Sequence, residues 1–159
     1  AWAVNILGGE AVTNGLLASA RGVGSVIGGL SLASLARYKV RGRLLTIGTF
    51  VFPVALLVFA FMRWQTQALI MLAVLGFASV FVLNVANALV QSLVPEALRG
   101  RVMSIYSLVF FGALPIGSLL IGWLAQAAGE QIAVILDGAL ALGVAVLLWL
   151  FLPRLRALE

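Results

Sequence analysis

Five long apolar segments fill this chain almost from end to end, and they restrict its fold more than any other feature. They cover residues 13–36, 44–62, 68–92, 102–128 and 132–152. A helix needs about 20 apolar residues to cross the hydrocarbon core of a bilayer. Because lipid offers the backbone no hydrogen-bond partner, each segment must be helical to satisfy its own amides. The sequence therefore predicts an all-α fold: a polytopic transmembrane helical bundle with five spans.

The composition supports this prediction and excludes several functions. Hydrophobic residues make up 64% of the chain and charged residues only 9%, whereas soluble domains carry about 25% charged residues. The chain has no cysteine and no histidine, which excludes disulfides, thiolate metal sites and histidine-based catalysis. The sequence also lacks paired carboxylates and a phosphate-binding loop. We therefore expect no enzymatic activity, no catalytic residues, no cofactor and no metal site.

The basic residues predict the orientation of the spans. Most of them would lie on one side of the membrane if the five segments alternate in direction. The basic cytoplasmic loops and tail would contain Arg37, Lys39, Arg41, Arg43, Arg99, Arg101, Arg154 and Arg156. Positively charged loops stay in the cytoplasm, so the amino terminus is expected outside and the carboxyl terminus in the cytoplasm. These charges would contact anionic lipid headgroups and do not indicate nucleic-acid binding.

The chain reads as a single transmembrane domain over residues 1–159. It begins at Ala1 without a methionine, and an apolar stretch over 1–7 leads into a polar turn. We expect residues 1–12 to be the end of a preceding helix and an outer loop. The loops between spans are short, and nothing indicates a soluble domain or a long linker.

Small residues mark two segments as places of close helix packing. Gly24 and Gly28 lie four residues apart in the first segment, and the fourth contains Gly112, Pro115 and Gly117. Small residues allow helix backbones to approach closely in lipid, and a proline inside a helix removes a hydrogen bond and favours a kink. The pattern predicts either helix packing or a helix that bends during transport.

Polar residues on the third segment give the most specific signal. Asn84, Asn87 and Gln91 follow a helical spacing, so that one face carries three amides. An amide facing lipid would lack a partner, so this face should point into protein or a wet cavity. It would serve either as an interhelical contact or as part of a substrate path. Ser104 and Ser107 of the fourth segment are candidates to complement it.

Two ionisable residues fall inside spans, where an unpaired charge is costly. Arg21 lies about eight residues into the first segment, and Asp137 about five residues into the fifth. The two could pair at similar depth. We predict that Arg21 faces a cavity, and that Asp137 either extends its side chain to the membrane interface or accepts a hydrogen bond near it.

Three stretches carry a family resemblance: residues 20–24, residues 84–107 with PEALRGRVMS at 95–104, and residues 110–118. They resemble the carboxyl-terminal half of major facilitator superfamily transporters, in the bacterial exporter branch that includes the enterobactin exporter. The resemblance implies that the five segments correspond to helices eight to twelve of that fold, in a bacterial inner membrane. It also implies that the first, third and fourth segments face the transport path. The basic loop over 36–43 lacks the acidic residue that family members often carry there.

The resemblance implies that the chain is the carboxyl-terminal part of a secondary active transporter. Such a protein would export a small organic or amphipathic molecule by alternating access, coupled to protons. Transporters of this superfamily place the substrate site between two six-helix halves, so five spans cannot enclose a path alone. The expected partners are lipids, a small-molecule substrate, and a missing amino-terminal half or other membrane subunits. The alternative is a truncated, transporter-like assembly subunit of a larger membrane complex without transport activity.

Overall fold

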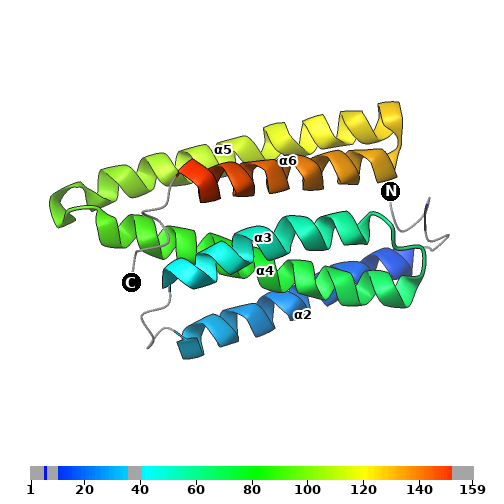
Figure 1. Cartoon of the computed structure of the whole chain (residues 1–159), viewed down its shortest axis with the longest axis horizontal. Helices are drawn as coiled ribbons and strands as arrows, with labels where there is room; N and C mark the ends of the chain where they lie inside the picture. The colour runs from blue at the N-terminus through cyan, green and yellow to red at the C-terminus, as the bar shows by residue number, and fades with distance from the viewer. Residues whose placement is uncertain (1–5, 7–10, 36–40, 152–159) are drawn as a thin grey trace.

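The computed structural model describes residue 6 and residues 11–35 and 41–151, and these ranges contain five helices. The helices are α2 (Ala11–Leu35), α3 (Arg41–Phe59), α4 (Gln65–Leu93), α5 (Glu96–Ala128) and α6 (Glu130–Phe151). They lie nearly parallel to one long axis and alternate in direction (Figure 1). The described part of the chain is otherwise made of short turns, so the prediction of an all-α fold is confirmed.

The helices pack in an order that differs from their order in the sequence. α2 packs along α4, α4 also packs on α3, α3 packs on α6, and α6 packs on α5. α4 and α5 barely touch, although only two residues separate them. α2 and the α5–α6 pair consequently lie on opposite sides of α3 and α4 (Figure 1).

The number of spans is confirmed only in part. Four helices are long and apolar enough to cross a membrane, over Ala11–Ser34, Gln65–Leu93, Glu96–Ala128 and Glu130–Phe151. The apolar part of α3 is the shorter Thr46–Phe59. α3 ends at Phe59, before the predicted boundary at residue 62, because the chain turns there. The amides of Phe61 and Met62 donate to carbonyls only three residues back, a tighter geometry than that of an α-helix.

Four of the predicted loop arginines are helical, so the prediction of basic loops at these positions is wrong. α5 begins at Glu96, well before the predicted start at residue 102. Pro95 precedes the first turn with an extended backbone, and the Glu96 carboxylate suits the positive end of the helix dipole. These features start the helix early, which places Arg99 and Arg101 on it with exposed side chains. Arg41 and Arg43 likewise begin α3, whereas Arg37, Lys39, Arg154 and Arg156 fall outside the described residues.

Glycine allows α2 and α4 to pack backbone against backbone. A Cβ atom added to Gly24 or Gly28 would collide with the backbone of α4, at Ala73 and Phe77 respectively. From the other side, a Cβ atom added to Gly76 would collide with the backbone of α2. Such close approach maximises dispersion contacts where lipid provides no hydrophobic driving force between helices. The α2–α4 pair is therefore the most closely packed unit of the bundle.

α5 is the least covered helix. It has 33 residues, none of them buried within the described structure. It exposes large apolar side chains, including those of Leu108, Phe111, Leu119 and Trp123. Because α5 packs mainly on α6, most of its surface is free to contact lipid or further protein.

Candidate functional site

The three amides of the predicted polar face lie along the last third of α4. Asn84 and Gln91 are exposed and Asn87 is half-buried. The Asn84 Nδ2 group donates to the Val80 carbonyl at 2.9 Å, and the Gln91 Nε2 group donates to the Asn87 Oδ1 atom. Both bonds stay within α4, so among the described residues this polar face forms no hydrogen bond to another helix, and the side chains of Asn84 and Gln91 are exposed. It offers donors and acceptors to a solute or to a further helix.

The two serines predicted to complement this face lie on α5 and do not bond to it. The Ser104 hydroxyl donates to the Gly100 carbonyl of its own helix at 2.8 Å. Ser107 is exposed, and the described residues provide it with no hydrogen-bond partner. Because α4 and α5 barely touch, the structure does not bring the amides and the serines together. Whether they line one path remains a prediction.

Arg21 lies on α2 beside the contact with α4, with an exposed side chain. Its carbonyl accepts a hydrogen bond from the Ser25 hydroxyl at 3.0 Å, and that hydroxyl also lies 3.3 Å from the Gly76 carbonyl of α4. The backbone of Arg21 is thus held in the α2–α4 contact. Among the described residues no carboxylate forms an ion pair with its guanidinium group, which leaves a cation exposed within a candidate span.

The suggested ion pair between Arg21 and Asp137 is absent from the structure. Asp137 lies on α6, on the far side of α3 and α4 from α2 (Figure 1). Its neighbour Gly138 packs against the Leu57 side chain of α3, which fixes this part of α6 on α3. Asp137 itself is exposed, and no hydrogen bond to it is found in the described ranges.

The small residues predicted to pack or bend fall into two groups. Gly24 and Gly28 lie in the α2–α4 contact, as described above. Gly112 and Gly117 of α5 have open space where a side chain would be. α5 continues through Pro115, and the Ser118 hydroxyl donates to the Leu114 and Pro115 carbonyls at 2.9 and 3.0 Å. The hinge role of α5 remains a prediction.

Two features were missed at the sequence level. Gly76 completes the α2–α4 contact, but no spacing of small residues along α4 draws attention to it. The Arg63 guanidinium donates to the Gln131 side-chain oxygen at 3.3 Å, linking the α3–α4 turn to the start of α6. The only signal for that link in the sequence was weak: Arg63 and Gln131 lie in two loops that the alternation of the segments places on the same side of the membrane.

Metal binding has no support in the described ranges, where no three acidic, cysteine or histidine residues gather. The site therefore consists of an amide-bearing helix face, an unpaired cation and a closely packed helix pair. Such groups can bind and release a polar or amphipathic solute, but they include no arranged nucleophile or acid–base pair.

Comparison with known proteins gives a family match over nearly the whole chain. The major facilitator superfamily family described as transmembrane secretion effector matches residues 2–159. Five curated relatives match, and all are called multidrug efflux pump Tap. The one from Mycolicibacterium fortuitum is 32% identical over 145 residues, covering 91% of this chain and 35% of the relative. The one from Mycobacterium tuberculosis (strain ATCC 25618 / H37Rv) is 30% identical over 136 residues, covering 86% of this chain and 32% of the relative.

The chain spans about a third of the length of these curated relatives. No solved structure matches the chain.

Proposed function

This chain belongs to the transmembrane secretion effector family of the major facilitator superfamily, and from that premise we propose that it forms part of a secondary active exporter. The family is one of transporters, which agrees with the prediction that the chain is not an enzyme. The exported solute is a small organic or amphipathic molecule, moved by alternating access in exchange for protons. The match across residues 2–159 carries this proposal, and the name of the relatives, multidrug efflux pump Tap, supports efflux.

The proposed substrate path runs along the exposed faces of α2, α4 and α5. Arg21, Asn87 and Gln91 contribute a cation and amides to it, and Asn84, Ser104 and Ser107 extend its polar lining. These groups support a path because they are polar, lie within candidate spans and are largely exposed. Buried apolar residues, by contrast, hold α2, α3 and α4 together.

We also propose that α3 is the fifth span. α3 packs between α4 and α6, and both of these helices are long enough to cross a bilayer. If α3 were only partly inserted, the apolar surfaces through which it contacts α4 and α6 would be exposed to water. The domain is then a five-span unit in the bacterial plasma membrane. Its amino terminus faces outward and its carboxyl terminus faces the cytoplasm, as the distribution of basic residues indicates.

Further helices complete the transporter by covering α5. The uncovered apolar surface of α5 supports this proposal, because a substrate path between two helical halves needs a second wall. These helices belong to an amino-terminal half or to other membrane subunits. An assembly subunit without transport activity would use the same surface of α5, so a flux measurement must separate the two functions.

Export is tested by expressing the natural protein that contains this chain in a bacterial strain lacking its main efflux pumps. An amphipathic fluorescent cation such as ethidium serves as the probe. We expect ethidium accumulation to fall several-fold, and to recover when a protonophore collapses the proton gradient. Unchanged accumulation of ethidium and of an uncharged amphipathic dye, with the protein present in the membrane fraction, would favour the assembly subunit.

A further inference from the structure

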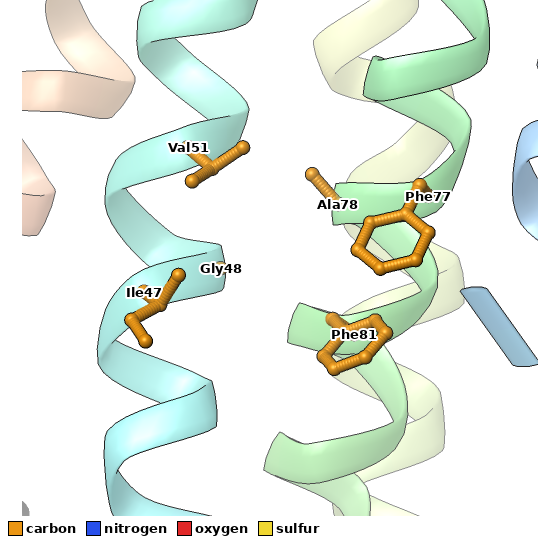
Figure 2. A pocket seen from close by; sticks show the side chains of 6 residues that line it. All are labelled: Ile47, Gly48, Val51, Phe77, Ala78 and Phe81. Atoms are coloured by element: carbon orange, nitrogen blue, oxygen red, sulfur yellow. The ribbon is translucent and has the colours of Figure 1, made fainter. Parts of the chain in front are cut away.

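An apolar cavity of about 200 Å³ lies between α3 and α4. Figure 2 shows the lining side chains, three from each helix, on either side of the gap. They are Ile47, Gly48, Val51, Phe77, Ala78 and Phe81. None of these side chains carries a polar atom.

Small residues keep this cavity open. Gly48 has no side chain, and a Cβ atom placed there would lie only 3.1 Å from the Val82 side chain of α4. Ala78 is buried and short, so it forms a floor without filling the space. The Phe77 and Phe81 rings stack at a centroid distance of 4.6 Å and make one rigid wall. The cavity is therefore shaped by the small residues and the stacked rings at the α3–α4 contact.

The cavity opens toward the surroundings of the bundle. Ile47 is 59% exposed and Val51 37% exposed, whereas Ala78 and Phe81 on the α4 side are buried. Water in such a groove would find no hydrogen-bond partner, and an empty groove would leave its walls without dispersion contacts. A hydrocarbon chain satisfies both conditions, and α3 lies beside two candidate spans, where hydrocarbon surrounds it.

The position of the groove along α3 selects one kind of hydrocarbon chain. α3 begins at Arg41, and Arg43 follows in its first turn. At 1.5 Å of rise per residue, Ile47 and Val51 lie about 9 and 15 Å along the helix from Arg41. One leaflet contributes roughly 15 Å of hydrocarbon. The groove therefore lies at acyl-chain depth in the leaflet where α3 begins, and two arginines begin the helix near its headgroups.

The geometry points to a binding site for an anionic phospholipid, with one acyl chain in the α3–α4 groove and the phosphate near the start of α3. The sequence places two positive charges in the first turn of α3, which suits an anionic headgroup, and the groove provides apolar contact to the chain. The site requires α3 to lie in the bilayer, but it does not require the protein to transport anything. Its failure and the failure of export are thus separate results.

Native mass spectrometry of the purified full chain in mild detergent tests this site. Dioleoyl phosphatidylglycerol is the anionic probe, and dioleoyl phosphatidylcholine, with identical acyl chains, is the zwitterionic one. We expect the first phosphatidylglycerol to bind at least about tenfold more tightly than phosphatidylcholine, since two basic residues near a membrane surface together add attraction of at least this order. The double variant Arg41→Gln/Arg43→Gln should abolish this preference. The matched variant Arg99→Gln/Arg101→Gln, at the start of α5, should retain it.

The groove is tested by variants that change its shape. Ile47→Ala/Val51→Ala shortens two lining side chains. It should weaken the binding of both lipids several-fold, because contacts with the acyl chain are lost. Ile105→Ala/Val109→Ala is the control, since it removes exposed residues of the same types at the same spacing on α5. Ala78→Leu places a larger side chain inside the groove and should also weaken the binding of both lipids. Ala113→Leu on α5 is its control. Circular dichroism checks that each variant keeps its helices.

Three results of the lipid-binding measurements would overturn the site. They are equal affinity for the two lipids, equal effects of the α3 and α5 arginine pairs, and unchanged lipid binding by a folded Ile47→Ala/Val51→Ala protein. Because Ile47 and Val51 are exposed, this double variant should fold even if Ala78→Leu does not. A dimer that forms in place of lipid binding would also overturn it, since a second copy would then fill the groove.

Discussion

Among the polar residues of the proposed path, Arg21 gives the strongest reason to expect a function, because it places a charge within a candidate span. A cation at the centre of a span costs a few kcal/mol on insertion scales, and the described residues offer its guanidinium group no carboxylate. Replacing it with alanine should therefore ease membrane insertion while removing a polar contact from the proposed path. A residue retained only for packing would behave differently, because its loss would weaken the folded bundle.

We expect Arg21→Ala to lower efflux at least tenfold while the amount of protein in the membrane stays the same or rises. Arg21→Lys should restore part of the flux, because it keeps the charge and loses the planar donor geometry. Arg99→Ala is the control, since this exposed arginine lies at a helix start. Dye efflux and quantitative immunoblotting of membranes measure the two quantities. Full flux in Arg21→Ala would exclude Arg21 from the path.

Single residues also show how far the sequence could predict this site. Helical spacing alone placed Asn84, Asn87 and Gln91 on one face of one helix, because that relation is local. The separation of Arg21 from Asp137 could not be predicted. It depends on α2 packing on α4 while α6 packs on α3, and no local spacing specifies that order.

At the scale of helices, the α2–α4 contact should dominate the stability of the bundle. Gly24 and Gly76 lie against backbone atoms of the facing helix, which cannot move aside as a flexible side chain can. A β-branched side chain at either position must push the helices apart, which also removes the contact between Ser25 and the Gly76 carbonyl. The cost should exceed that of ordinary overpacking, about 1–3 kcal/mol.

We therefore predict that Gly24→Val and Gly76→Val lower the thermal unfolding temperature in detergent. Gly112→Val and Gly117→Val on α5 provide matched controls, because nothing lies within 4 Å of either position. Circular dichroism during heating measures the transition. Equal unfolding temperatures for the α2–α4 and α5 variants would show that the close backbone contact contributes little to stability.

Helix boundaries show a similar limit of sequence reasoning. Hydropathy located α4 within a few residues, because polar residues flank it on both sides. It placed the start of α5 too late, because the charged stretch that begins at Glu96 resembles a loop in composition. That stretch is helical because Pro95 and Glu96 form a favourable helix start, and hydropathy does not measure this effect. Hydropathy also missed the early end of α3. The turn at residues 60–62 is apolar, so its composition does not distinguish it from the helix.

For the whole molecule, the absence of cysteine gives a direct test of orientation. The starts of α4 and α5 lie near opposite ends of the bundle (Figure 1), and Gln67 and Arg99, in the first turns of these helices, are both exposed. A single cysteine at either position is then the only thiol of the 159 residues. With the carboxyl terminus in the cytoplasm, Gln67→Cys should face outward and Arg99→Cys inward.

We expect a membrane-impermeant maleimide to label Gln67→Cys in intact cells, and to label Arg99→Cys only after the membrane is permeabilised. The unmodified chain, which has no thiol, gives the background. The positions depend on different helices, so the pair also tests whether α4 crosses the bilayer completely. The opposite pattern would invert the orientation, and labelling of both positions in intact cells would mean that α4 does not span. The expected pattern would place Arg99 and the start of α3 on the same cytoplasmic side, which assigns the proposed lipid to the inner leaflet.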